Sequence, residues 1–134
     1  MSQERFAERK AELSHAAARL REAVAQPETD LIRDAVIQRF EFTFELCWKS
    51  LKLYLERQGL DCGGPRSTLK KAFAEGLIGS EEEADDWLQM LEDRNLVSHA
   101  YDEALATRIY RRVAQDYAAL LAEMAGKIQA LSWE

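Results

Sequence analysis

The segment from Asp30 to Gln58 constrains the fold of this chain more than any other. It contains no glycine or proline, and its apolar residues recur at intervals of three and four. This seam is typical of a helix that faces a hydrophobic core: Val36, Phe40, Phe44, Cys47, Leu51 and Leu55. Further apolar residues widen the surface beyond one stripe: Phe42, Leu46, Trp48, Leu53 and Tyr54. A helix that is apolar on two sides is central in a bundle or buried in an oligomer. We expect both here, with a core on one side and a subunit contact on the other.

Residues 2–26 and 103–131 predict two more long helices. Pro27 interrupts the first of them, and Thr29 or Asp30 is available to cap the helix that follows. The last one is capped by Asp102 and carries a seam with a spacing of three and four: Leu105, Ile109, Val113, Tyr117, Leu120, Met124, Ile128 and Leu131. His15 falls beside the apolar stripe of the first helix. We expect a structural or solvent-exposed role for it rather than a chemical one.

Two further helices complete the expected fold. A short one covers residues 66–75, between Pro65 and the capping glycine Gly76. The other runs from residue 81 to 95 and starts with a capping box, in which Ser80 is the cap and Glu83 follows three residues later. Short connections make neighbouring helices antiparallel. The sequence therefore predicts an all-α, antiparallel up-and-down helical bundle of four long helices and one short helix, a single domain over residues 1–134 that forms a homodimer.

Composition bounds the classes of function. No window approaches the ~18 apolar residues needed to span a membrane, and the N-terminus has no apolar signal core. The two cysteines, Cys47 and Cys62, lack metal-ligand spacing, so we expect free thiols in a reducing cytoplasm. No metal and no cofactor is expected.

The charge is acidic overall but uneven along the chain. A net charge of -6 argues against a general nucleic-acid coat, because neutralising phosphates requires clustered Lys and Arg. Residues 31–72 nevertheless carry eight basic and five acidic residues, whereas residues 73–106 carry one basic and ten acidic residues. A focused basic surface therefore remains possible, and the average does not exclude RNA.

One stretch brings an arginine, a histidine and a tyrosine close together in sequence: Arg94-Asn95-Leu96-Val97-Ser98-His99-Ala100-Tyr101-Asp102-Glu103. Five positions along a regular helix turn through about 500°, which separates Arg94 and His99 by about 140°. The two converge only if the helix breaks between them or a second subunit supplies the partner. Val97, Ser98 and the expected cap at Asp102 favour a break. The alternative interpretation is an ordinary helix-end arginine with a partly buried histidine.

An arginine with a histidine is sufficient to cleave RNA without a metal. The 2′-hydroxyl needs a base, the leaving 5′-oxygen needs an acid, and the phosphorane needs positive charge. Histidine titrates near neutral pH, and a fixed guanidinium can bind phosphate through two hydrogen bonds. One histidine cannot easily serve both faces of an in-line displacement, whereas a two-fold dimer would place two copies at one cleft.

Several segments in order resemble the HEPN family, in the branch of nucleotidyltransferase substrate-binding proteins. The Arg94-Asn95-x3-His99-x-Tyr101 stretch is similar to the Arg-x4-His-x-Tyr signature of HEPN domains. The likeness covers residues 28 to 125 and includes residues 38–52, Gly64-Pro65-Arg66, Ala72-Phe73-x2-Gly76-Leu77-Ile78 and His99-Ala100-Tyr101-Asp102-Glu103. The same branch resembles HEPN toxins paired with minimal nucleotidyltransferase antitoxins.

The resemblance implies a dimer with the paired motifs at the interface cleft. It implies ribonuclease activity in which Arg94 and His99 are catalytic, and Asn95 matches the polar residue that commonly follows the arginine. In the toxin branch, the tyrosine matching Tyr101 is the residue to which the partner enzyme attaches AMP. The implied partners are RNA and a minimal nucleotidyltransferase encoded nearby.

Two other functions stay open. The acidic segment around the motif favours a non-catalytic adaptor, a substrate-binding subunit of a small nucleotidyltransferase that uses the motif as a docking surface. A purely structural helical oligomer is the third possibility. For Tyr101, the alternative to modification is a ring packed on the last helix with its hydroxyl in water.

Overall fold

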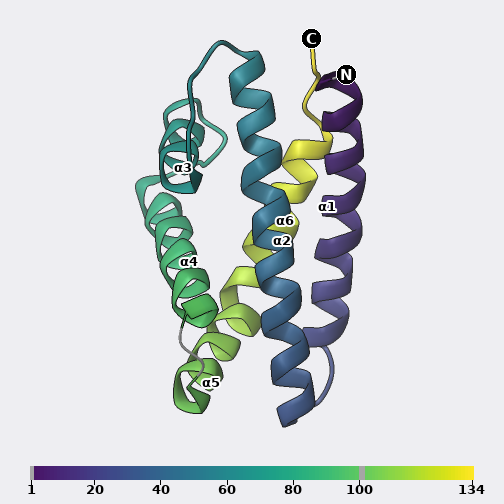
Figure 1. Cartoon of the computed structure of the whole chain (residues 1–134), viewed down its shortest axis with the longest axis vertical. Helices are drawn as coiled ribbons and strands as arrows, with labels where there is room; N and C mark the ends of the chain where they lie inside the picture. The colour runs from purple at the N-terminus through teal and green to yellow at the C-terminus, as the bar shows by residue number, and fades with distance from the viewer. Residues whose placement is uncertain (1, 100–101) are drawn as a thin grey trace.

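The computed structural model describes residues 2–99 and 102–134 of the 134-residue chain. Within them, the order of helices is α1 (Ser2–Val24), α2 (Asp30–Arg57), α3 (Pro65–Ala74), α4 (Glu81–His99), α5 (Glu103–Arg112), a π-helical segment η1 (Val113–Tyr117) and α6 (Ala118–Gln129). Figure 1 shows α2 running along the middle of the molecule, with α1 on one side and α3 and α4 on the other. The predicted all-α antiparallel helical bundle is confirmed.

The helix ends follow the expected capping chemistry. Thr29 accepts a hydrogen bond from the backbone N–H of Ile32, 3.0 Å away, and so begins α2. Asp102 begins α5 by accepting hydrogen bonds from the N–H groups of Ala104 and Leu105. The Ser80 hydroxyl accepts from the N–H of Glu83 at 3.1 Å, while the Glu83 carboxylate reaches back to the N–H of Gly79 at 2.7 Å. The Ser80 bond is the usual one of a capping box, whereas the bond to the Glu83 carboxylate comes from the residue before the cap.

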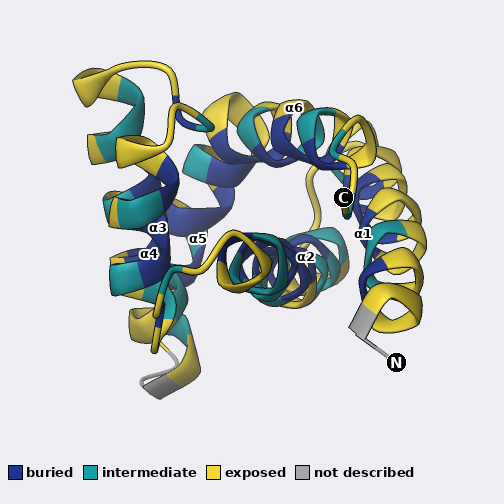
Figure 2. Ribbon diagram, turned by 90° about the horizontal axis from the view of Figure 1, so that it is seen from above, coloured by how far each residue is buried: buried dark blue, intermediate teal, exposed yellow. Residues whose placement is uncertain are grey.

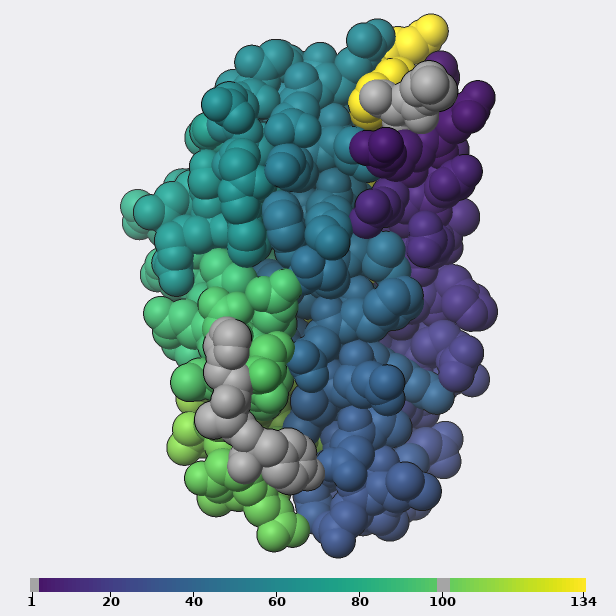
Figure 3. All heavy atoms as spheres, in the orientation of Figure 1, coloured from purple at the N-terminus to yellow at the C-terminus, as the bar shows by residue number. Residues whose placement is uncertain are grey.

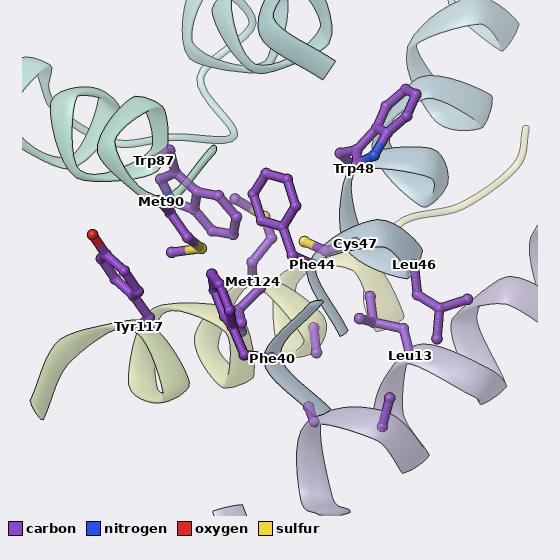
Figure 4. Close-up of a cluster of buried hydrophobic side chains, with 14 of the residues drawn as sticks. Leu13, Phe40, Phe44, Leu46, Cys47, Trp48, Trp87, Met90, Tyr117 and Met124 are labelled. Atoms are coloured by element: carbon purple, nitrogen blue, oxygen red, sulfur yellow. The ribbon is translucent and has the colours of Figure 1, made fainter. Parts of the chain in front are cut away.

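The core lies along α2, as the seam predicts. Figure 2 shows buried residues of every helix turned toward the interior of the bundle. Phe40 and Phe44 are fully buried, and the Phe40 ring stacks on Tyr117 at 5.6 Å while Phe44 lies 6.4 Å from Trp87. Figure 4 shows these aromatic rings from α2, α4 and η1 meeting in one cluster. Truncating a buried aromatic ring to alanine costs about 3–5 kcal/mol, so this cluster is a main source of stability.

One expectation about the later helices is wrong. The expected end of the fourth helix at Asn95, with a break before His99, does not occur, because α4 continues to His99. Val97 packs on the core and Ser98 is hydrogen-bonded to α2, and these contacts outweigh the weak local preference against a helix. The expected long last helix over residues 103–131 forms as α5, η1 and α6, which follow one another without a gap to Gln129 and include one wider π turn. Its apolar side chains step by four from Ile109 to Leu121, which drifts round a regular helix, and the wider π turn restores the buried face.

No helix among the described residues is long and apolar enough to cross a membrane.

Candidate functional site

Arg94 is held at the surface between α4 and α2. Its guanidinium pairs with the Glu45 carboxylate of α2, donates to Asn95 Oδ1 at 2.9 Å and lies over the Phe44 ring at 5.7 Å. The arginine side chain is 22% exposed. The guanidinium is therefore fixed in position from two sides but still open to solvent, as the recognition of an anion requires.

A second polar link between the same two helices lies one turn further on. Ser98 Oγ donates to Glu41 Oε2 at 2.8 Å. Glu41 and Glu45 are four residues apart on α2, and Ser98 and Arg94 are four apart on α4. Because the helices are antiparallel, the two pairs form successive rungs that tie the last two turns of α4 to α2. These rungs keep α4 helical through the motif.

Arg94, Asn95 and Ser98 line one side of a groove of about 900 Å³. The floor is formed by α2 and the opposite side by α1, which contributes His15 and Arg19. Figure 3 shows this face of the molecule, with α4 beside α2 and α1 beyond it. One large apolar side chain is exposed here: Phe42 in the groove is 57% exposed. We call this region the Arg94 groove.

The electrostatics of the Arg94 groove favour an ionised Glu45. Burial acts to raise the pKa of Glu45, but the neighbouring Trp48 indole N–H and the charge of Arg94 outweigh it and hold the pKa below its ordinary value of 4.5. Trp48 Nε1 itself is buried without a hydrogen-bond partner among the described residues, so it acts as a nearby dipole. Lys49, four residues further along α2, pairs with Glu45 at 3.3 Å. One carboxylate therefore balances two cations.

Asp93, next to Arg94 in sequence, is buried in a polar network. It is 1% exposed, and its carboxylate accepts from Arg112 Nη1 at 2.9 Å on both oxygens and from the Tyr117 hydroxyl at 2.5 Å. The hydrogen bond to Asp93 raises the pKa of Arg112, and burial together with that same carboxylate raises the pKa of Tyr117. This network fixes α4 against α5 and η1, and so fixes the backbone that carries Arg94.

The expected site residues are placed as follows. The structure puts Arg94 and Asn95 together in the Arg94 groove. The backbone of His99 ends α4, but its side chain and Tyr101 lie outside the described residues. His15 is solvent-exposed and lines the Arg94 groove from α1.

The two cysteine thiols have low reactivity. Cys47 and Cys62 are free and buried, and burial raises the pKa of both thiols. No group of three His, Cys, Asp or Glu side chains within residues 2–99 and 102–134 could hold a metal ion. The cations that line this groove are Arg94, Arg19 and Arg39.

Sequence reasoning missed Asp93, Glu41 and the pairing of Arg94 with Glu45. No role was predicted for Asp93, although it follows Trp87 and Met90 at intervals of three on the buried face of α4. That spacing was a usable signal. The pairing of Arg94 with Glu45 joins residues 49 positions apart, and no local pattern announces it.

Comparisons with known proteins agree with this architecture. Residues 8–130 match the family described as nucleotidyltransferase substrate binding protein like. A probable ribonuclease HepT from Haemophilus influenzae is 33% identical over 89 residues, which cover 63% of this chain and 59% of that protein. The chain therefore spans about three fifths of the length of this curated relative.

A crystal structure of a protein from Thermus thermophilus has the same fold. It is 40% identical, with a TM-score of 0.79, and the match covers 87% of this chain and 98% of that one. Together with the family match over nearly the whole chain, these relatives establish the assignment. The chain belongs to the nucleotidyltransferase substrate-binding branch of the HEPN family.

Proposed function

We propose that this protein is a metal-independent endoribonuclease of the HEPN toxin type, with Arg94 and His99 as catalytic residues and Asn95 in support. The observation that carries the proposal is the fixed, solvent-open guanidinium of Arg94 in a groove of about 900 Å³, on the same unbroken helix as His99. The relative named as a probable ribonuclease supports the reaction class.

The continuous helix favours a two-chain site, because positions 94 and 99 are about 140° apart on a regular helix. A homodimer with a two-fold axis along the motif brings Arg94 of one chain toward His99 of the other and supplies two histidines. Phe42, exposed in the Arg94 groove, offers apolar area for such a contact.

The chemistry then follows from the two residues. One imidazole takes the proton of the 2′-hydroxyl, whose oxygen attacks phosphorus. The 5′-oxygen leaves with a proton supplied by the second imidazole, and a 2′,3′-cyclic phosphate remains. Arg94 binds the phosphate oxygens as charge accumulates in the phosphorane. Every proton is accounted for by the two histidines.

Cleavage of a labelled RNA in EDTA tests the proposal. The purified protein should produce cyclic-phosphate or 3′-phosphate ends, and His99→Ala or Arg94→Ala should lower the rate by about 10²–10⁴-fold, the usual range for lost acid–base or electrostatic catalysis. Exogenous imidazole should restore part of the His99→Ala activity. Arg111→Ala, an exposed arginine on α5, is the matched control. Full activity of His99→Ala would attribute the cleavage to a contaminant.

Tyr101 is the proposed point of control. A minimal nucleotidyltransferase encoded nearby would catalyse attack of the Tyr101 hydroxyl on the α-phosphorus of ATP, releasing diphosphate and leaving AMP on the tyrosine. The added phosphate would repel RNA and compete for Arg94. Co-expression with that enzyme should add the mass of AMP to the Tyr101 peptide and silence cleavage, and Tyr101→Phe should resist. If the Phe variant were silenced equally well, the partner would have to act by covering the cleft.

The second candidate is a non-catalytic, substrate-binding adaptor for a small nucleotidyltransferase. It is favoured by the description of the matched family and by the net charge of -6. Growth arrest on expressing this protein alone, relieved by His99→Ala, would support the toxin. Stable complex formation with a neighbouring nucleotidyltransferase, unchanged by His99→Ala and without any arrest, would support the adaptor.

A further inference from the structure

A second groove, of about 710 Å³, adjoins the Arg94 groove between the start of α3 and the middle of α4. Its lining comes mostly from α3 and the turn before it: Gly64, Pro65, Arg66, Ser67, Lys70 and Lys71, with Leu91 and Asn95 from α4. Asn95 lines both grooves and also accepts a hydrogen bond from Arg94. The two grooves therefore meet at the residue that touches the proposed catalytic arginine. We call the second one the α3 groove.

The α3 groove is positively charged, whereas the whole chain has a net charge of -6. Its lining contains three cations, Arg66, Lys70 and Lys71, and no acidic residue. Lys71 Nζ donates to the backbone carbonyl of Asp61, which leaves its charge uncompensated. Within the described part of the chain, Arg66 and Lys70 pair with no carboxylate. On an acidic protein, three uncompensated cations in one groove mark a surface for an anionic ligand.

Backbone groups add to this potential. The cap residue of α3 is Gly64, which offers no side-chain hydrogen bond, and Pro65 follows as the first helical residue. The N–H groups of Arg66 and Ser67 therefore begin the helix without a side-chain cap, at its positive end and inside the same groove. On the far side of Lys70 the surface changes sign, because the neighbouring pocket is lined by Glu81 and Asp85. The positive charge is thus confined to the side of α3 that faces Asn95.

We infer that the α3 groove binds the phosphates of single-stranded RNA on one side of the bond that is cleaved in the Arg94 groove. The inference rests on the proposed ribonuclease function and names how that site holds its substrate. Arg66, Lys70 and Lys71 bind successive phosphates of the strand, and Asn95 marks the passage from the binding groove to the catalytic one. Binding through phosphates makes this part of the contact insensitive to base sequence.

Equilibrium binding in the His99→Ala background tests this assignment without any turnover. A fluorescently labelled single-stranded RNA of about 20 nucleotides exceeds the usual site size of single-strand binding proteins. Each phosphate contact on a single strand contributes ~0.7 to the slope of log K against log salt, so losing two contacts in Arg66→Glu/Lys70→Glu should reduce that slope by about 1.4. At about 0.1 M salt this corresponds to roughly 25-fold weaker binding. The neutral pair Arg66→Gln/Lys70→Gln loses the same two contacts and should show the same change in slope and about the same loss of affinity, while repulsion adds to the loss in the Glu pair.

Arg108→Glu/Arg111→Glu is the matched control, since both arginines are exposed on α5, line neither groove and change the net charge equally. It should bind RNA with nearly the wild-type slope. Equal weakening by both double variants would mean a response to overall charge and would overturn the α3 groove assignment. Wild-type binding by the α3 groove variants would overturn it too.

Two outcomes distinguish RNA binding in the α3 groove from protein docking there and from the ribonuclease proposal. If the α3 groove variants bound RNA normally but failed to bind a co-expressed nucleotidyltransferase, the groove would be a protein docking site and the RNA assignment would be wrong. If wild-type protein bound RNA through the α3 groove but never cleaved it, the ribonuclease proposal would fail while the binding site stood.

Discussion

Replacing Asp93 by asparagine tests whether the buried network behind Arg94 holds the last turns of α4 in place. The carboxylate makes four contacts: Oδ1 accepts from Arg112 at 2.9 Å and Gln89 at 3.2 Å, and Oδ2 accepts from Arg112 at 2.9 Å and Tyr117 at 2.5 Å. Asparagine keeps the shape and removes the charge. Its oxygen can serve Arg112 and Gln89, and its amide can donate to the Tyr117 oxygen.

The expected loss follows from what asparagine cannot do. Removing one partner of a fully buried ion pair costs ~3–5 kcal/mol. Here the Arg112 side chain is 41% exposed, so water can compensate part of its charge, whereas the Asp93 side chain is 1% exposed. The rearranged hydrogen bonds survive in neutral form, at about half the strength of charge-assisted ones. We therefore expect Asp93→Asn to lower the free energy of unfolding by about 2 kcal/mol and Tm by about 6–10 °C.

Urea unfolding followed by circular dichroism measures this directly. Glu92→Gln is the control, because Glu92 is the adjacent residue and is exposed, and it should change the free energy of unfolding by less than about 0.5 kcal/mol. Tyr117→Phe and the double variant complete a cycle, whose coupling energy should reach at least about 0.5 kcal/mol. An Asp93→Asn protein as stable as Glu92→Gln would refute the reasoning, and the network would then contribute no net stability.

Three further predictions concern other parts of the molecule. The pKa of Glu45 is below its ordinary value of 4.5, so the stabilisation by its ion pair is complete above that pH and is lost as the pH falls below it. In urea titrations, Glu45→Gln should therefore approach wild-type stability only in acid. Parallel stability curves of the two proteins from pH 7 to 3 would contradict this. Phe42→Glu should weaken the proposed homodimer in sedimentation, because a charge replaces an exposed ring in the Arg94 groove. Phe73→Glu, on α3 and outside that groove, should not weaken it; equal effects would place the contact elsewhere. Gly126→Ala in α6 should raise the free energy of unfolding by roughly 0.5–1 kcal/mol, since the added Cβ meets nothing within 4 Å. Gly59→Ala should lower the free energy of unfolding, because Gly59 has a φ of 94°. The reverse order of the two variants in thermal melts would contradict this.

Local rules predicted what is local in this fold. The seam of α2 followed from its spacing of three and four, and the caps at Thr29 and Asp102 followed from residue type and position. These features depend on hydrogen bonds and periodicities that span a few residues. The same rules placed Arg94 and Asn95 in the candidate site as neighbours, because they are adjacent in sequence.

The contacts that were not predicted depend on the register of one helix against another. The pairing of Glu45 with Arg94, and that of Glu41 with Ser98, fix the register of α2 against α4, and only the packed core determines that register. Those contacts also extend α4 past Val97, where propensity favoured an end. The burial of Asp93 was not predicted, because its cation, Arg112, lies 19 positions further along the chain.

The π-helical segment η1 sets the helical phase of everything that follows it. Each residue of an α-helix turns about 100°, so converting Val113–Tyr117 to a regular α-helix without removing a residue would rotate α6 by about 100° relative to α5. α5 packs against α2 and α4, whereas α6 packs against α1 and α2. The rotation would leave the first set of contacts intact and turn Leu121, Met124 and Ile128 out of the second. The π turn takes up one extra residue, so one continuous helix packs on α2 and α4 in its first half and on α1 and α2 in its second. The packing of α1 therefore depends on η1.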